Sequence, residues 1–176
     1  MITQAGGASV HASAVLIGDR AVLIRGPSGA GKSRAAFDLI LAGRAGQIPR
    51  AVLIGDDRVY LHACEGQLRV RPARELAGLI EVRGLGIRRC EFAEEAGVGL
   101  IVDLCAEDAE RLPPTEALQA VVFGVSIPRI PVGAGFAAVP IIVAALTMTA
   151  SSSSTQHSAD CSKGIGNHIR PTIATE

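Results

Sequence analysis

The 176-residue sequence has no tryptophan, one tyrosine and four phenylalanines, so aromatic residues make up only 3% of it. Valine, isoleucine, leucine and alanine must therefore fill the interior, which favours a layered α/β core over an aromatic-rich β-sandwich. The length predicts one domain with a single core. Seventeen basic residues balance seventeen acidic ones, so no net charge attracts the protein to nucleic acid or to a membrane.

The sequence also lacks the signals of a disulfide framework, a secretory leader or a membrane anchor. Its four cysteines are scattered without a C-x-x-C pair, which is typical of reduced thiols. The N-terminus has no basic segment followed by an apolar one. The apolar stretch 136–148 is shorter than the roughly 20 residues of a spanning helix and contains Pro140. We therefore expect a buried element there, in a soluble, cytoplasmic protein.

The apolar pattern predicts one ordered domain over residues 1–148. Apolar runs at 14–17 and 21–25 flank a Gly18-Asp19-Arg20 turn and predict a β-hairpin. The spacing of apolar residues over 33–42 predicts a helix that ends at Gly43. Further strands are predicted at 51–54, 59–63, 68–71, 98–104 and 120–123, and helical segments at 73–79 and 106–112. Residues 140–146 fit either a helix or a strand.

Residues 149–176 differ in composition from the rest of the chain. They begin with a serine-rich run and show no apolar periodicity. Such a segment cannot bury enough apolar surface to offset the entropy lost on ordering, which predicts a disordered tail. His157, Cys161 and His168 lie in it, but their spacing fits no standard metal site.

The strongest signal is a match to G-x-x-x-x-G-K-[ST] between a predicted strand and a predicted helix. The matching residues are Gly26, Pro27, Ser28, Gly29, Ala30, Gly31, Lys32 and Ser33. The glycines allow turns that point successive N–H groups inward, and the positive end of the helix favours a phosphate. Lys32 would reach the β- and γ-phosphates, and the Ser33 hydroxyl would complete the coordination of magnesium. The motif predicts a nucleoside triphosphate site with Mg²⁺.

Phosphoryl transfer also needs a carboxylate for the metal and, in a kinase, one that accepts the proton of the attacking hydroxyl. The paired Asp56 and Asp57, Glu81 and Asp103 all adjoin apolar runs, and ligands of open α/β sheets gather at strand ends. Each acid could instead cap a helix or solvate a turn. Spacing alone does not rank Asp57 against Asp103. His11, taken alone, is more simply a structural or exposed histidine.

Four segments taken together resemble the catalytic domain of the HPr kinase/phosphorylase family. They are His11, the loop 26–33, Asp56-Asp57-Arg58-Val59, and residues 81–87, which read E-V-R-G-L-G-I. The last is close to E-[IV]-R-G-L-G-[IL], the most specific signature of the family. The family uses ATP to phosphorylate a serine of the small phosphocarrier protein HPr, and can reverse the step with inorganic phosphate. The resemblance covers about residues 10–146.

The resemblance implies an α/β P-loop catalytic domain with a mixed central sheet, similar to the HPr kinase/phosphoenolpyruvate carboxykinase fold. It also implies a cytoplasmic homo-oligomer, a hexamer, that acts on an HPr-type carrier of the phosphotransferase system and so regulates carbon metabolism. Full-length relatives carry a separate N-terminal domain, for which the 176 residues leave no room. We therefore expect a short form of the family.

The resemblance also implies roles for single residues. Asp57 would take the proton from the protein serine, and His11 would lie beside it. Glu81 would join Ser33 in holding the metal, while Lys32 binds phosphate. These implied roles favour Asp57 as the base and lift His11 from a structural to a functional residue.

Two later segments complete the expected site. Arg111, in Glu-Arg-Leu-Pro, would match a later active-site arginine of the family. Residues 130–136 occupy the place of a basic loop that the family uses in the reverse reaction, but no basic residue lies between Pro131 and Pro140. A phosphoserine or free phosphate there would lack charge partners. We therefore expect a kinase with weak or absent phosphorylase activity.

Two other functions stay open from the sequence. A P-loop kinase for a small metabolite would normally need an arginine-rich lid, and Arg88-Arg89 is the only adjacent arginine pair in residues 1–148. A non-catalytic nucleotide sensor is the third possibility. The presence of Lys32, Ser33, Asp57 and Glu81 together argues against it.

Overall fold

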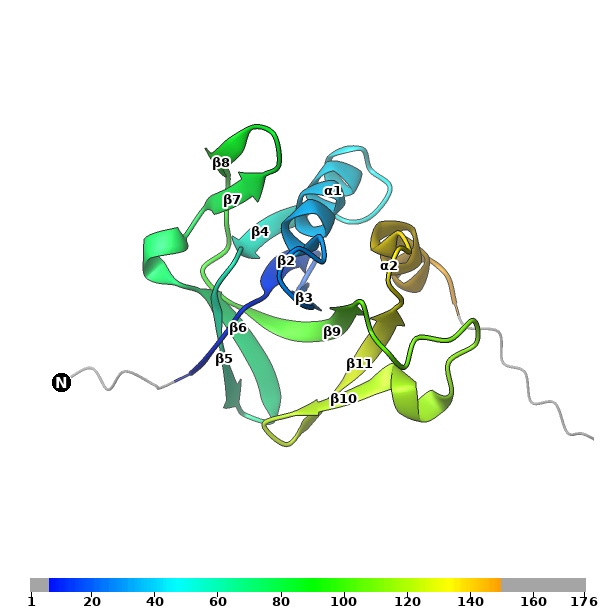
Figure 1. Cartoon of the computed structure of the whole chain (residues 1–176). Helices are drawn as coiled ribbons and strands as arrows, with labels where there is room; N and C mark the ends of the chain where they lie inside the picture. The colour runs from blue at the N-terminus through cyan, green and yellow to red at the C-terminus, as the bar shows by residue number, and fades with distance from the viewer. Residues whose placement is uncertain (1–6, 150–176) are drawn as a thin grey trace, which may run out of the picture.

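The computed structural model describes residues 7–149 (Figure 1). The first strands are β1 Ala8–Val10, β2 Ser13–Ile17, β3 Arg20–Arg25, β4 Ala51–Gly55, β5 Val59–Cys64 and β6 Gln67–Pro72. The later strands are β7 Leu79–Val82, β8 Gly86–Arg89, β9 Ala96–Leu104, β10 Gln119–Val122 and β11 Val125–Val132. The helices are α1 Lys32–Arg44 and α2 Ala138–Thr147, with 3-10 turns at Arg74–Leu76 and Thr115–Leu118. The predicted tail, apart from Thr149, lies outside the described residues.

The central sheet is mixed, as predicted, and most of its pairs are antiparallel. Its strands follow the order β1-β5-β6-β9-β3-β2-β4, and β11 pairs with the second half of β9. Strand β9 is parallel to both β3 and β11. Strand β2 is antiparallel to its neighbours β3 and β4 and forms the predicted hairpin with β3.

These directions bring five separate segments to one edge of the sheet. Strands β3, β4, β9 and β11 all run the same way, and β2 runs against them. The edge therefore holds the segment after each of the four strands: the phosphate loop 26–33, the pair Asp56-Asp57, the segment 105–114 and the segment 133–137. It also holds His11, which precedes β2. Open α/β sheets place their ligands at such an edge.

Aliphatic side chains on both faces of the central strands build two core layers. On β3, Ile24 packs with Leu39 of α1 and Ile142 of α2, whereas its neighbour Leu23 packs with Leu61 of β5 on the opposite face. All five are essentially inaccessible to solvent. Because successive strand residues point to opposite faces, both helices lie on one face of the central strands, and strands β5 and β6 of the same sheet contribute to the core on the other face (Figure 1).

The helix predicted at 106–112 is wrong. After β9 the chain turns at Cys105, whose φ is +57°, and runs through turns to the 3-10 turn Thr115–Leu118. Local propensity cannot hold so short a helix without a packed apolar face, and Arg111 and Leu112 are exposed here. The helical turn predicted at 73–79 shortens to Arg74–Leu76, because Leu79 already belongs to β7.

Gly43 does not end α1, which continues to Arg44. The reason for a glycine at 43 is close packing against the start of β4. A Cβ there would lie 2.7 Å from the Ala51 nitrogen and 2.8 Å from the Ala51 Cβ. The positive-φ glycine that follows the helix is Gly46, with φ +72°.

The stretch 140–146, which fitted either structure, is helical and belongs to α2. Pro140 is the third residue of the helix, where a missing N–H removes no helical hydrogen bond. The helix has ten residues and buries Ala138 and Ile142. Within residues 7–149, no helix is long and apolar enough to cross a membrane.

The Gly43 contact predicts a sharp cost for one added methyl group. Gly43→Ala should lower the free energy of unfolding by about 1–3 kcal/mol, because overpacking against the β4 backbone outweighs the better helix propensity of alanine. Urea denaturation measures this change. Gly97→Ala is the matched control, since its new Cβ would meet nothing closer than 3.5 Å. Equal stability of the two variants would contradict the close packing of α1 on β4.

Candidate active site

The phosphate loop leaves β3 and enters α1 through three glycines with positive φ. Gly26, Gly29 and Gly31 have φ of 148°, 80° and 93°, which side chains other than glycine rarely adopt. Gly26 is constrained by its φ and also by its packing, since a Cβ on it would lie 2.9 Å from the Leu104 carbonyl oxygen. The start of the loop therefore rests directly on the end of β9.

The N-terminus of α1 is open to an anion. No side chain caps it, and no acidic residue lies in its first turn. The first helical N–H groups have no partner within the helix, and the helix dipole adds partial positive charge there. Ser33 lies in this first turn. This end of the helix fits a phosphate group by the chemistry of its donors.

Lys32 is buried beside the loop, with 5% of its surface exposed. Its ammonium group donates hydrogen bonds of 2.9 Å to the carbonyl oxygens of Gly26 and Pro27. These two carbonyl oxygens keep the Lys32 ammonium group beside the loop, within the turn that would surround a phosphate. A bound phosphate would offer the same ammonium a charged acceptor, which makes stronger hydrogen bonds than neutral carbonyls do.

The adjacent Asp56 and Asp57 have separate environments. Asp56 is 4% exposed. Its carboxylate accepts a 2.5 Å hydrogen bond from the Ser13 hydroxyl and a 3.1 Å hydrogen bond from the Glu81 backbone N–H. It thus ties the end of β4 to the start of β2 and to β7. Asp56 is thus a buried anchor and Asp57 an exposed acid. Their adjacent positions in the sequence could not reveal this difference.

Asp57 lies next to His11 at the sheet edge. The Nε2 atom of His11 is 3.3 Å from Oδ1 of Asp57, and the two side chains are 49% and 69% exposed. Asp57 has a φ of +65°, a left-handed conformation that aspartate tolerates better than most residues. The carboxylate is therefore held outward at the end of β4, where a substrate from solution can reach it.

Glu81 reaches the same edge through the β7–β8 hairpin, held by its backbone bond to Asp56. Its side chain is exposed. Across residues 7–149, no three His, Cys, Asp or Glu side chains lie close enough together to hold a metal ion. Ser33 and Glu81 are the two residues to which the family resemblance gives a role in holding Mg²⁺. Such a sparse set fits magnesium, which usually keeps several waters and binds through substrate phosphates.

Asp103, the other candidate acid, is committed to two arginines. Its carboxylate accepts two 2.7 Å hydrogen bonds from Arg25 and one of 2.6 Å from Arg129. Burial alone would raise the pKa of Asp103, but the hydrogen bonds from Arg25 and Arg129 outweigh it and hold the pKa below its ordinary value. A metal would have to displace both arginines, so the contacts favour Asp57 over Asp103 independently of any resemblance.

Arg111 lies exposed in the segment 105–114 that follows β9, and no hydrogen bond or ion pair to another described residue holds its side chain. The segment around it is held instead by Asp108, which pairs with Arg129. Arg25 and Arg129 drew no attention in the sequence, because an arginine gives no sign of an acid 78 or 26 residues away. Residues 130–136, which occupy the place of the family's basic loop, contain only apolar residues, proline and glycine.

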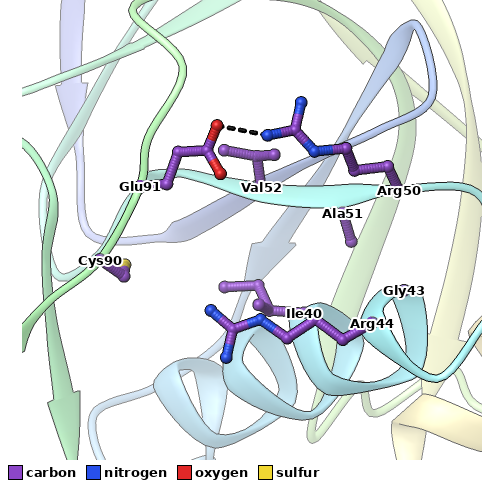
Figure 2. Close-up of a pocket in the computed structure, with 8 residues that line it drawn as sticks. All are labelled: Ile40, Gly43, Arg44, Arg50, Ala51, Val52, Cys90 and Glu91. Atoms are coloured by element: carbon purple, nitrogen blue, oxygen red, sulfur yellow. Dashed lines mark hydrogen bonds and ion pairs between the residues drawn. The ribbon is translucent and has the colours of Figure 1, made fainter.

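A separate pocket lies at the opposite end of α1 (Figure 2). It encloses about 280 Å³ and includes Arg44, Arg50, Cys90 and Glu91. The helix has 13 residues, which separates this pocket from the phosphate loop by ~20 Å. Arg50 pairs with Glu91 there. Burial raises the pKa of the Cys90 thiol despite the nearby Arg44, so the cysteine stays a protonated thiol.

The family follows from comparison with known proteins. The model of the HPr Serine kinase C-terminal domain matches residues 3–163. The chain belongs to this family. The resemblance seen in the sequence is thereby confirmed.

Relatives and a solved structure agree with this assignment. An HPr kinase/phosphorylase of Mycoplasma mycoides subsp. mycoides SC is 32% identical over 153 residues, which cover 79% of this chain and 47% of that protein. The one from Streptococcus thermophilus is 44% identical over 80 residues, 45% of this chain and 24% of its own length. The chain thus spans less than half of these relatives.

The structure of the Hpr(Ser) kinase/phosphatase from Coxiella burnetii shows the same fold. It superposes with a TM-score of 0.63 and 24% identity, covering 79% of this chain and 93% of that one. The expected fold class, a mixed α/β domain that matches the HPr kinase/phosphatase structure, is confirmed.

The two neighbouring aspartates should respond differently to the same substitution. Asp56→Asn should lower the free energy of unfolding by about 1–3 kcal/mol, because its amide leaves only one oxygen for the Ser13 hydroxyl and the Glu81 N–H. Asp57→Asn should change it by less than about 0.5 kcal/mol, since the side chain is exposed and asparagine tolerates the same backbone conformation. Urea denaturation of both variants checks this. An equal loss in both would refute the division into anchor and exposed acid.

Proposed function

We propose that this chain is an ATP- and Mg²⁺-dependent kinase that phosphorylates a serine of an HPr-type phosphocarrier protein. The observation that carries the proposal is the His11–Asp57 pair, 3.3 Å apart and exposed at the sheet edge that also holds the phosphate loop. Membership of the HPr serine kinase C-terminal domain family supports it. So do the names of the relatives, HPr kinase/phosphorylase.

The proposed reaction divides the work between the two parts of the edge. The open N-terminus of α1 and the Lys32 ammonium would hold the phosphates of ATP and stabilise charge as the γ-phosphoryl group transfers. Asp57 would accept the proton of the carrier serine as its oxygen attacks phosphorus. His11 would orient the Asp57 carboxylate. Mg²⁺, held by Ser33 and Glu81, would neutralise phosphate charge when bound.

The exposure of the pair favours a protein substrate. Asp57 is 69% exposed, so a serine presented on the surface of another protein can reach it without a closing lid. A kinase for a small metabolite would normally exclude water around its base. The sheet edge and the exposed pair thus favour the protein-serine kinase over the metabolite kinase. A protein that only senses nucleotide would have no use for a paired aspartate and histidine at this edge. The His11–Asp57 pair therefore argues against that alternative.

Weak or absent reverse activity is part of the proposal. The stretch 130–149 contains no lysine or arginine. Arg129, just before it, is 14% exposed and already bound to Asp103 and Asp108. Neither supplies a free cation for inorganic phosphate or a phosphoserine, and such anions bind through charge-assisted hydrogen bonds. Arg111, exposed in the segment after β9, is assigned instead to the forward phosphotransfer, as the match of the family's later active-site arginine.

A homo-oligomer, taken as a hexamer, belongs to the same proposal. Leu85 and Ile87 on the β7–β8 hairpin are 57% and 65% exposed, and apolar side chains clustered on a surface commonly mark interfaces. The wider role, regulation of carbon metabolism through a cytoplasmic phosphotransferase system, depends on the identity of the carrier. Light scattering on the purified chain measures its mass in solution.

Replacing the proposed base should separate chemistry from binding. Asp57→Asn should lower kcat by at least roughly 100-fold, because an amide cannot accept the serine proton, and leave the affinity for MgATP unchanged. Incubation with labelled ATP, Mg²⁺ and an HPr-type protein, followed by mapping of the label to serine or histidine, measures the activity. Asp19→Asn, in the turn at the opposite end of the β2–β3 hairpin, is the control. Full activity of Asp57→Asn, or label on histidine, would overturn the proposal.

The reverse reaction gives a second test. Serine-phosphorylated carrier incubated with the protein and inorganic phosphate should lose its phosphate at less than about a tenth of the forward rate, since residues 130–149 offer no cation. Intact-mass spectrometry of the carrier follows the loss. Rapid dephosphorylation would show that this segment is not the determinant of reversal.

A further inference from the structure

We propose that Asp108 and Arg129 are positioning residues that fix the Arg111 segment relative to the phosphate loop. Arg129 donates one hydrogen bond to the half-buried Asp103 and two to Asp108, which lies three residues before Arg111. The inference rests on the proposed function, in which Arg111 acts in phosphotransfer.

The carboxylate of Asp103 anchors this network, on a strand that lies between two parallel neighbours. In the sheet, Asp103 of β9 stands opposite Arg25 of β3 on one side and Pro131 of β11 on the other. Arg25 holds both carboxylate oxygens, and the Arg129 Nε holds Oδ2 at 2.6 Å. The side chains of Asp103 and Arg129 are only 17% and 14% exposed. Charges so far removed from water keep their partners, because an unpaired one is costly there.

The remaining donors of Arg129 point to the segment after β9. Its Nη1 and Nη2 atoms donate hydrogen bonds of 2.6 and 2.9 Å to the two carboxylate oxygens of Asp108, and Nη1 also donates 3.0 Å to the Ala117 carbonyl. A planar guanidinium with both ends occupied cannot turn without breaking several of these bonds. The Ala106 N–H further bonds the Val132 carbonyl at 2.9 Å. The segment has no helix or strand of its own, so these bonds set its path.

The other end of the same network is the phosphate loop. Arg25 directly precedes Gly26, and Gly26 packs so closely on Leu104 that a Cβ would lie 2.9 Å from its carbonyl oxygen. The root of the loop and the segment that carries Arg111 therefore share one support, the end of β9. Acidic and basic side chains in it balance, two of each, so no net charge remains to attract a ligand.

An ordinary surface ion pair is the competing explanation, since Asp108 is 52% exposed. Exposed pairs contribute little to stability, and a pair of that kind would leave activity unchanged when broken. What distinguishes this pair is its bidentate geometry on an arginine that is itself held by a half-buried acid. Stability alone cannot separate the two explanations, but catalysis can.

The test is Asp108→Asn, with Glu107→Gln as the matched control. Glu107 is exposed on the same segment and makes no hydrogen bond or ion pair with another described residue. Asp108→Asn should lower kcat for carrier phosphorylation about 10-fold, because a displaced Arg111 loses its alignment. The Kd for MgATP and the KM for the carrier should stay within about 2-fold. Glu107→Gln should match the wild type. An Asp108→Asn variant as active as Glu107→Gln would overturn the inference.

A double-mutant cycle with Arg111→Ala shows whether Asp108 acts through Arg111. In that background, Asp108→Asn should cause no further loss of kcat, since the group it positions is gone. An additional loss of about 10-fold there would overturn the inference, because it would show that Asp108 acts independently of Arg111.

Hydrogen exchange tests the structural tie without any need for activity. Peptide amides in 105–118 should exchange faster in Asp108→Asn than in Glu107→Gln, while those of α1 stay unchanged. Unchanged exchange in 105–118 would overturn the inference. If the wild type shows no kinase activity but this difference appears, the proposed function fails and the tie between Asp108, Arg129 and the segment stands.

Discussion

The direction of the central strands is the constraint on which the rest of this structure depends. Because β2 runs against β3 and β4, while β9 and β11 run with β3, four strands end and one begins at the same edge. Segments more than a hundred residues apart in the chain meet there. Two aliphatic core layers hold the sheet that makes this possible.

Charge at this edge is divided into a supporting part and an exposed part. Asp56 is buried and Asp103 half-buried, and both accept hydrogen bonds that hold strands and loops in place. Asp57, His11 and Arg111 stand in the open. Burial makes an unpaired charge costly, so the buried acids are fully occupied. Exposure costs little, which leaves the outer groups free to meet a substrate.

This division explains why an aspartate after an apolar strand can mislead. Asp103 ends a buried strand in the manner of a metal-binding acid, yet two arginines take up its oxygens. Asp57 is less conspicuous, the second of a pair after a short strand, and it is the one held outward beside a histidine. The difference lies in partners from β3 and β11, far away in the sequence.

The sequence by itself determined the phosphate loop, the hairpin before it, the helix after it and most strands, because each is encoded by local glycine placement and apolar spacing. It also carried the E-V-R-G-L-G-I segment by which the family is recognised. Only the tertiary structure decided which aspartate is buried, why position 43 is glycine, that 106–112 is not helical, and that Arg25 and Arg129 share Asp103. Those outcomes depend on contacts between strands distant in sequence, whose register no local pattern records.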